Sequence, residues 1–419
     1  MRESGRRRLT LLLMTAAAAM MIAPQLDAVA KLPEAISVTP GRGHGLPVTP
    51  ALEASLTGDG RGAAEITEAA GGGLELYTGT RGESTLTYRL LGLPVRKVAV
   101  RSDAQRRLIP GGQSVGVAID TRGVIVVGAS DLGSVPSPAR LAGLKNGDII
   151  QRVNGVDVNS AEALAGTICS GDAVQLEILR KGEARSCTVV PAMDARDGSW
   201  RLGAWVRDST AGIGTLTFVD PATGRFGALG HAVTDADTRV LMPVGEGELY
   251  ANRVVDVSPS ACGRPGELTG DFVFQPQAIG SVERNTDQGI FGTLDGESGA
   301  YAASDGLVAA RRDEIHAGPA SLLTTMDESG VREYACEIER VNDRGDGERA
   351  MVLKITDSEL LARTGGIVQG MSGSPVLQDG KLVGAITHVM VNDPQRGYGI
   401  CIEDMLEQAD ALDASAEAA

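Results

Sequence analysis

Aromatic residues are scarce in this sequence, at 3% of 419 residues, whereas glycine is abundant, with 55 copies. Hydrophobic residues make up 42% of the chain, which is not the composition of a disordered protein. Many glycines with few aromatics favour a turn-rich β protein over a helical bundle. At roughly 150 residues per domain, the length allows two compact domains.

Basic residues are outnumbered: 39 Lys and Arg stand against 54 Asp and Glu, for a formal charge of −15. A nucleic-acid partner requires a concentrated Lys and Arg surface. No basic stripe occurs beyond the first eight residues. We therefore expect no nucleic-acid partner.

Cysteines are few, odd in number and widely scattered: Cys169, Cys187, Cys262, Cys336 and Cys401. They form neither a disulfide framework nor a set of closely spaced metal ligands, and only a Cys169–Cys187 pair stays open. The sequence also lacks a His-Glu-x-x-His motif, a Cys-x-x-Cys pair and a Gly-rich phosphate loop with Lys. We expect no metal and no other cofactor.

The N-terminal apolar run, Leu9–Ala23, is about 15 residues long and so falls short of the ~20 that span a bilayer. Arginines precede it, and Ala28-Val29-Ala30 follows as a small-x-small site. This arrangement is typical of a secretory signal peptide at residues 1–30, with an uncleaved membrane anchor as the alternative. Under both interpretations we expect the remaining chain to lie outside the cytoplasm.

Two regions of different character follow the N-terminal segment. Residues 31–84 are rich in Gly, Ala, Thr and Pro, and we interpret them as a loosely ordered linker. Residues 85–104 contain two short strand patterns, at 86–90 and 95–100, and form a short β lead-in.

The most specific signal in the N-terminal half is the stretch Ser137–Ile150, which contains Leu-Ala-Gly-Leu-Lys-Asn-Gly-Asp. It predicts a short helix that ends at Gly143, a turn, and a strand that leads to an Asn154-Gly155 hairpin. Residues 105–192 resemble a PDZ domain. The resemblance implies that a peptide adds as an extra strand beside a Gly-rich loop, here Val115, Gly116, Val117, Ala118 and Ile119. The chain's own N-terminal segment is one candidate ligand.

Residues 193–412 contain many short apolar segments separated by Gly and Pro. Such spacing predicts a β-barrel or β-sandwich rather than a βαβ sheet. A helix at about 404–411 closes this region, and we expect residues 413–419 to be a disordered tail.

A candidate nucleophile lies in the glycine-rich segment Gly365–Pro375. Glycines flank Ser372 and permit a tight turn in which the N–H groups of Gly370 and Ser372 converge on one point. Acyl transfer requires such an exposed hydroxyl together with backbone donors for the oxyanion. A Gly-Ser turn between strands is common, so this segment alone leaves a structural role open.

A candidate base comes earlier in the chain. His231 follows an apolar strand and a glycine, in Leu229-Gly230-His231-Ala232, and the chain has only four histidines. A histidine on an apolar strand is often only a core residue. His388 lies 16 residues beyond Ser372 in a strand pattern, and we interpret it as a residue that lines the pocket.

Four motifs in order resemble the SpoIVB peptidase family (stage IV sporulation protein B): Gly203–Thr215, Leu229–Asp235, Gly365–Pro375 and Thr387–Pro394. The resemblance spans residues 85–410. It implies a PDZ domain followed by a chymotrypsin-like double β-barrel, so the fold is mainly β. It also implies a serine endopeptidase with Ser372 as nucleophile, His231 as base and Asp357 as acid, and with the backbone of Gly370 and Ser372 as oxyanion hole.

The resemblance further implies a place in sporulation signalling. Such peptidases are exported into the space between the two membranes of the developing spore. There they cleave a regulatory membrane protein, which activates an intramembrane metalloprotease and a late sigma factor. Members also cleave themselves.

Two kinds of alternative stay open at this point. Asp357 starts a helical pattern and has a helix N-cap as its structural interpretation; other candidate acids are Asp235, Asp256 and Asp271. For the whole chain, the alternatives are a PDZ adaptor with an inactive protease fold and a general envelope protease for quality control.

Overall fold

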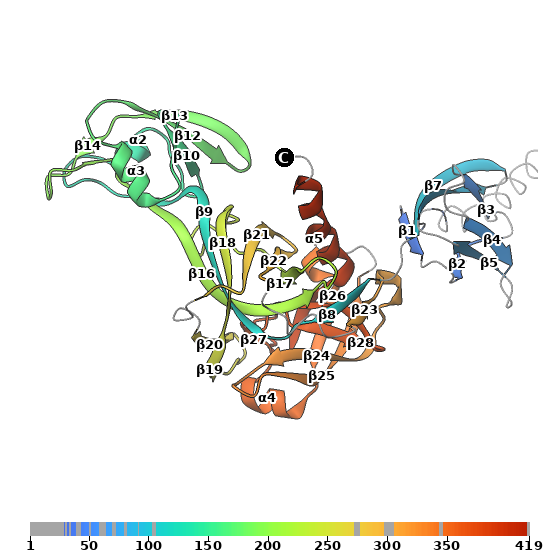
Figure 1. The fold of residues 1–419 in the computed structure, drawn as a ribbon. Helices are drawn as coiled ribbons and strands as arrows, with labels where there is room; N and C mark the ends of the chain where they lie inside the picture. The colour runs from blue at the N-terminus through green and yellow to red at the C-terminus, as the bar shows by residue number, and fades with distance from the viewer. Residues whose placement is uncertain are drawn as a thin grey trace, which may run out of the picture. The chain divides into compact units, whose positions relative to one another are not determined.

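The computed structural model describes residues 29, 32, 35–38, 43–49, 52–57, 64–68, 73–78, 82–90, 92–102, 106–271, 277–296, 306–342 and 347–416. The chain divides into two compact units, 1–106 and 107–419, of which we describe each by itself (Figure 1). Apart from Val29, the predicted signal peptide or anchor at residues 1–30 lies outside the described residues. Among the helices that are described, none is long and apolar enough to cross a membrane.

The first unit corrects the predicted linker. It contains a four-stranded sheet in the order β1-β7-β6-β3 and a three-stranded sheet in the order β2-β5-β4. The strands are β1 (Ala35–Val38), β2 (His44–Leu46), β3 (Leu52–Thr57), β4 (Ala64–Glu68), β5 (Leu74–Thr78), β6 (Gly82–Leu90) and β7 (Leu93–Ser102). Leu52, Leu76, Leu86 and Tyr88 are buried in a core of their own. Gly, Ala and Thr are frequent between these buried residues, so the alternation of apolar and polar residues is weak. The composition of the segment therefore led to the prediction of a linker.

The second unit contains two closed barrels of six strands each. In the first, each strand pairs with the next in the ring β9-β16-β17-β22-β21-β18. Its strands are β9 (Ser114–Ala129), β16 (Ala204–Val219), β17 (Arg225–Ala228), β18 (Val244–Ala251), β21 (Gly280–Thr286) and β22 (Gly289–Leu294). Phe226, Leu249 and Ile290 are among the buried residues of its core.

The second barrel closes through the ring β24-β25-β26-β30-β29-β28. Its strands are β24 (Gly318–Thr325), β25 (Val331–Val341), β26 (Met351–Ile355), β28 (Pro375–Gln378), β29 (Lys381–Val389) and β30 (Arg396–Cys401). Strand β8 (Arg107–Pro110) pairs with β16 of the first barrel and, through β23 (Leu307–Ala309), connects to β29 of the second. The predicted double β-barrel is confirmed.

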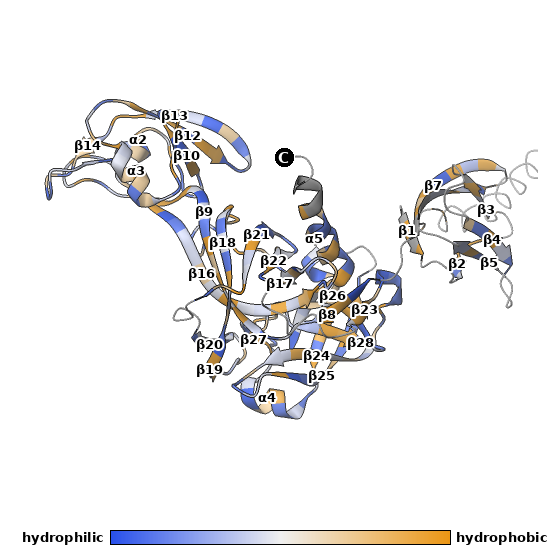
Figure 2. Cartoon of the chain, in the orientation of Figure 1, coloured by the Kyte–Doolittle hydropathy of each residue, from blue (hydrophilic) through white to orange (hydrophobic). Residues whose placement is uncertain are grey.

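Short elements complete the peptidase region. They are β19 (Arg253–Ser258), β20 (Gly266–Asp271), β27 (Val368–Gln369), the 3-10 turns η1 (Arg312–Glu314) and η2 (Gly347–Arg349), and the helices α4 (Ser358–Thr364) and α5 (Ile402–Ala416). Apolar and polar residues alternate along α5 (Figure 2). Ile402, Met405, Ala409 and Leu412 are buried at helical spacing over a core shared with β17, β22 and β29. The helix extends to Ala416, so residues 413–416 of the predicted disordered tail are helical.

The PDZ module is inserted between the two long strands of the first barrel (Figure 1). It contains α2 (Pro138–Leu141), β10 (Ile149–Val153), β11 (Val156–Asp157), α3 (Ala161–Thr167), β12 (Val174–Arg180), β13 (Glu183–Val189), β14 (Ala192–Met193) and β15 (Trp200–Arg201). Asn154 and Gly155, both at positive φ, make the predicted hairpin turn. The core runs from Val124 to Leu202, so the module starts later and ends later than the predicted 105–192.

Candidate active site

A cleft of about 830 Å³ lies where the two barrels meet. The first barrel contributes Val117 and residues 210–213 to its lining, and the second contributes Ser372 and residues 387–389. His231 lines the same cleft. The structure therefore brings together the predicted nucleophile and the predicted base, which are 141 residues apart in sequence.

Ser372 lies in a tight turn between β27 and β28. Within this turn Met371 N donates to Val368 O (3.1 Å) and Ser374 N donates to Met371 O (2.9 Å). Gly373 has φ +93°, and a Cβ on it would lie 2.1 Å from Thr215 O, so only glycine fits there. The oxyanion role of the N–H groups of Gly370 and Ser372 stays a prediction.

The first barrel fixes the position of this turn. Thr215 in β16 donates its N–H to Ser372 O at 2.9 Å and its hydroxyl to Gly370 O at 2.8 Å. Thr217 Oγ1 donates to Gly373 O at 2.8 Å. Because the turn belongs to the second barrel and these donors to the first, the serine is held by both barrels.

His231 follows β17 at the rim of the first barrel. Its Nδ1 lies 2.9 Å from the carbonyl oxygen of Ala232. A carbonyl oxygen only accepts, so this bond requires the proton on Nδ1 and leaves Nε2 with a free lone pair. This is the tautomer that a general base needs.

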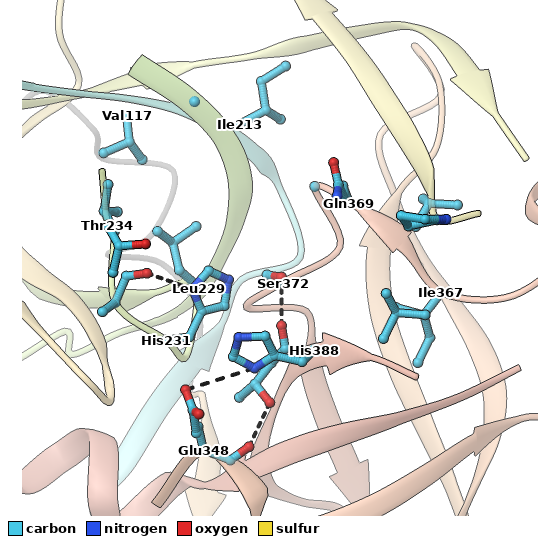
Figure 3. A pocket seen from close by; sticks show the side chains of 18 of the residues that line it. Val117, Ile213, Leu229, His231, Thr234, Glu348, Ile367, Gln369, Ser372 and His388 are labelled. Carbon is cyan, nitrogen blue, oxygen red and sulfur yellow. Dashed lines mark hydrogen bonds and ion pairs between the residues drawn. The ribbon is translucent and has the colours of Figure 1, made fainter. Parts of the chain in front are cut away.

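His388, on β29, lies against His231, with ring centroids 4.7 Å apart and ring planes tilted by 38°. Figure 3 shows the His388 ring between His231 and Glu348, and His388 Nδ1 is 3.9 Å from Glu348 Oε2. Ser372 Oγ donates to Thr387 O at 2.7 Å. The prediction that His388 lines the pocket is confirmed.

Burial dominates the electrostatics of both histidines. Burial lowers the pKa of His231, while the bond to Ala232 and the charge of Glu348 oppose this shift. The pKa of His388 is lowered to about 4, first by burial and then by the neighbouring His231 and Arg349. Both rings are therefore neutral near pH 7, as a general base must be.

The predicted acid, Asp357, does not line this cleft. Its carboxylate accepts from Leu360 N at 2.9 Å and forms the N-cap of α4, the structural role that the sequence left open. The rival Asp235 is buried and bound by Arg207 and Thr238. The acidic residues of the cleft, within the described ranges, are Glu348 and Asp287.

The structure corrects the prediction of the peptide-binding loop of the PDZ domain. Val115, Gly116, Val117, Ala118 and Ile119 lie in β9, where they pair with β16 on one edge and with β18 on the other. Peptide addition requires a strand with a free edge. These residues are part of a strand that is paired on both edges within the first barrel, so no peptide can add there.

A second cleft lies within the PDZ module, between helix α3 and the start of β16. Leu164, Ile168 and Trp200 line it, together with the β16 residues Ala204–Val206. In the described structure these three β16 residues pair only with β9, so their other edge is open. This is the arrangement that accepts an added strand.

Glu348 is a site residue that the sequence did not indicate as functional, and Thr387 was indicated only as the first residue of a motif, without a role of its own. Glu348 lies in a polar turn with no motif spacing to His231 or Ser372, and Thr387 contributes a backbone carbonyl, which any residue could supply. Among the residues that the structure describes, no group of His, Cys, Asp and Glu that could hold a metal ion occurs.

Comparison with solved structures gives weak, consistent likenesses. A PDZ domain of the SdrC-like protein from Listeria monocytogenes is 22% identical, covering 20% of this chain and 87% of that chain with a TM-score of 0.18. The inactive form of the Rv3671c protease of M. tuberculosis is 15% identical, covering 48% and 83%, with a TM-score of 0.27. The HtrA-type protease AlgW with decapeptide is 13% identical, covering 50% and 55%, with a TM-score of 0.28.

The family comparison concerns the peptidase region directly. Residues 198–406 match the model of the SpoIVB peptidase S55 family. The match includes the motifs around His231 and Ser372 and nearly all of both barrels. Residues 198–406 are therefore a SpoIVB peptidase domain, and the protein is a serine peptidase of that family.

Proposed function

We propose that this serine peptidase uses Ser372 as nucleophile and His231 as base, and that it cleaves a regulatory membrane protein outside the cytoplasm during spore development. The observation that supports the catalytic pair is their convergence on one cleft between the barrels. The signalling role is supported by the family to which the domain belongs.

The mechanism starts with a rotation of the Ser372 side chain from Thr387 O toward Nε2 of His231. Oγ then bonds to the scissile carbonyl carbon while its proton passes to Nε2, and the carbonyl π electrons move to the oxygen. The N–H groups of Gly370 and Ser372 hold this oxyanion, a contribution of roughly 10²–10³ in kcat. His231 returns the proton to the leaving amine, and water later hydrolyses the acyl-enzyme.

A fluorophosphonate probe tests the catalytic pair without knowledge of the substrate. We expect the chain from Lys31 onward to carry the adduct on Ser372, as mapped by mass spectrometry. Ser372→Ala and His231→Ala should both lose it, with a rate loss of about 10⁴ or more. A folded wild-type protein that takes no label, even with the PDZ module occupied or removed, would support the adaptor with an inactive protease fold.

The breadth of cleavage separates signalling from quality control. A general envelope protease cuts unfolded casein at many sites, whereas a signalling peptidase cuts few. We expect limited cleavage of casein by the wild type and none by Ser372→Ala. Cleavage of the chain itself, also absent in Ser372→Ala, would support self-processing.

The location proposal rests on the N-terminal segment. A basic start, an apolar run and a small-x-small site favour export, either with cleavage or as an anchor. Fractionation of cells that express the full chain tests this: we expect the peptidase region to be accessible to added protease in intact protoplasts, and cytoplasmic protection would contradict it.

The PDZ module has a proposed role in holding a peptide, at the β16–α3 cleft rather than at residues 115–119. An extended chain can pair with Ala204–Val206 and place an apolar side chain against Leu164 and Ile168. Whether the chain's own N-terminal segment is the ligand stays a prediction.

Tryptophan fluorescence tests this groove, because both tryptophans of the chain, Trp200 and Trp205, line it. A titration with an octapeptide that ends in leucine should change the emission of the wild type. Ala165→Arg, which fills the groove, should abolish the response. Ala163→Arg is the matched control: it is exposed on the same helix but does not line the groove.

A further inference from the structure

One strand, β16, passes through both clefts of the second unit. Its first residues, Ala204–Val206, line the cleft of the PDZ module, and its residues 210–213 line the cleft that contains Ser372. The strand is unbroken from Ala204 to Val219, and Figure 1 shows it as one long band from the PDZ module into the first barrel. The two clefts therefore lie along a single stretch of backbone.

Between the two clefts, β16 has an unpaired edge. From Ala204 to Thr215 the strand pairs with β9, and β17 takes the opposite edge only from Leu216 onward. At Thr215 this opposite edge faces the nucleophile, because Thr215 N donates to Ser372 O and Thr215 O accepts from Leu229 N. N-terminal to Thr215, no strand of the described chain pairs with this edge. We call the open edge at residues 204–213 the β16 track.

The backbone groups of the track are available close to the nucleophile. Alternate residues of a strand direct their N–H and C=O groups to opposite edges. Ile213, Ala211 and Ser209 alternate in step with Thr215, and β16 stays in register with β9 from Ser209 to Thr215. Their backbone groups therefore point to the open edge. Ser209 and Ala211 are exposed, so an extended chain can pair with this edge.

Contacts on both sides of β16 hold the two clefts in one geometry. Asp208 Oδ2 accepts from Ala161 N at 2.8 Å, which attaches the start of helix α3 to the middle of the track. Ile149 of the PDZ module belongs to one buried apolar cluster with Val240 and Met242, which lie in the loop after the catalytic base. The distance from the PDZ cleft to the nucleophile is therefore set by the fold and not by a linker.

The start of β16 gives the direction of the bound chain. Leu202 O accepts from Ala139 N at 2.8 Å and Gly203 O accepts from Ser130 N at 2.9 Å, so both carbonyl groups point into the module. In a trans peptide the N–H points opposite to the preceding C=O, so the N–H groups of Gly203 and Ala204 point away from it. These residues line the PDZ cleft, and neighbouring N–H groups of this kind bind a terminal carboxylate. A chain that ends there and pairs with the track runs antiparallel to β16.

We propose that one extended segment of the substrate lies along the β16 track, with its C-terminus in the PDZ cleft and its scissile bond at Ser372. The residues after the scissile bond then occupy the track. Because one substrate residue lies opposite each of the strand residues 204–213, cleavage falls about ten residues before the substrate's C-terminus. The substrate class is a polypeptide with a free, extended tail that ends in an apolar residue. This inference rests on the proposed roles of Ser372 and of the β16–α3 cleft.

A peptide library tests the distance without knowledge of the natural substrate. The full-length enzyme is given peptides of about 24 residues that are randomised except for a C-terminal leucine, which is long enough to extend beyond both clefts. Mass spectrometry of the products gives the distance of each cut from the C-terminus. We expect cuts about ten residues from the C-terminus to be enriched about 10-fold or more, because binding in the PDZ cleft raises the local concentration of that bond at Ser372. In a longer library this distance should stay the same, while the distance from the N-terminus grows.

Two modified libraries separate the track from simple tethering. The first carries N-methyl groups on two adjacent residues midway between the expected cut and the C-terminus, and these block pairing with β16. It should lose the enrichment, whereas the same two groups near the N-terminus, the matched control, should leave it intact. The second has a C-terminal amide in place of the carboxylate and should also lose the enrichment.

Two variants on one helix supply the control on the enzyme. Ala165→Arg fills the PDZ cleft and should lose the enrichment, whereas Ala163→Arg is exposed outside the cleft and should keep it. The inference is overturned if wild-type cuts are spread evenly relative to the C-terminus. It is equally overturned if the enrichment persists with the methyl groups midway or in Ala165→Arg. A wild type that neither cuts the library nor labels at Ser372 would instead refute the proposed function.

Discussion

Ser372 Oγ donates its hydrogen bond to the carbonyl oxygen of Thr387, 2.7 Å away, so in this structure the nucleophile points to β29 rather than to His231. Catalytic hydrogen bonds are often long or misaligned in an enzyme without substrate and tighten only when substrate binds. We expect Ser372 Oγ to turn toward His231 when substrate binds. Thr387 also positions Glu348, so a single residue of β29 contacts both sides of the site.

Gly373 should be irreplaceable in this turn. Gly373→Ala introduces a Cβ at 2.1 Å from Thr215 O and 2.5 Å from Leu229 N, at φ +93°. We expect a loss of more than about 2 kcal/mol of stability from backbone strain and contact, together with loss of Ser372 labelling. Gly380→Ala, at φ +73° but in open space, is the control. It should cost roughly 1 kcal/mol and leave labelling intact, as seen by thermal unfolding and the probe.

Asp357 should matter for stability, as the N-cap of α4. Asp357→Ala removes the acceptor for Leu360 N and should destabilise the protein by about 0.5–2 kcal/mol. Asp357→Asn should unfold at nearly the wild-type temperature. A large rate loss in both variants, at unchanged melting temperature, would return Asp357 to the catalytic site.

His388 should make the peptidase less stable in acid. Its pKa is lowered from 6.5 in the unfolded chain to about 4 in the folded one, so the unfolded state binds more protons between these values. The free energy of unfolding therefore falls as the pH drops through this window and is fully retained above it. His388→Gln should flatten the dependence of melting temperature on pH; the effect is reduced by solvent because the side chain is 43% exposed.

His316 should have the opposite effect on stability as the pH falls in the same experiment. Its Nε2 lies 2.9 Å from Asp379 Oδ2, and this pairing raises its pKa. Protonation of His316 therefore favours the folded state as the pH falls. His316→Gln should leave the acid-induced loss at least as steep as in the wild type, and a flattening there would contradict both assignments.

The PDZ module should depend on one buried ion pair. Asp148 is 1% exposed and is held by Arg180 through two bonds of 2.6 Å. Arg180→Met leaves this carboxylate without its partner and should cost about 3–5 kcal/mol, read from the denaturation midpoint of tryptophan fluorescence. Arg185→Met breaks an exposed pair with Glu183 and should change stability by less than about 1 kcal/mol. Equal effects of the two changes would contradict this account.

The sequence by itself determined the peptidase. The glycines around Ser372, the strand before His231 and the order of these motifs are local patterns, and their resemblance to one peptidase family predicted the nucleophile and the base and, correctly, the barrels. The Asn154-Gly155 hairpin and the short helix before Gly143 were likewise readable, because turn and helix signals act over a few residues. The same local signals placed Asp357 at the start of a helix, where a role as N-cap was the alternative to a role as catalytic acid.

Only the tertiary structure decided which side chains meet. Glu348 comes to His388 because η2 is attached to β29, a contact between residues 40 positions apart that no spacing encodes. Residues 115–119 are paired with strands on both sides, because β9 is one strand of 16 residues that passes through both the PDZ module and the barrel. The β unit at residues 35–102 was hidden for a related reason: its alternating pattern is weak, and burial is settled by partner strands distant in sequence.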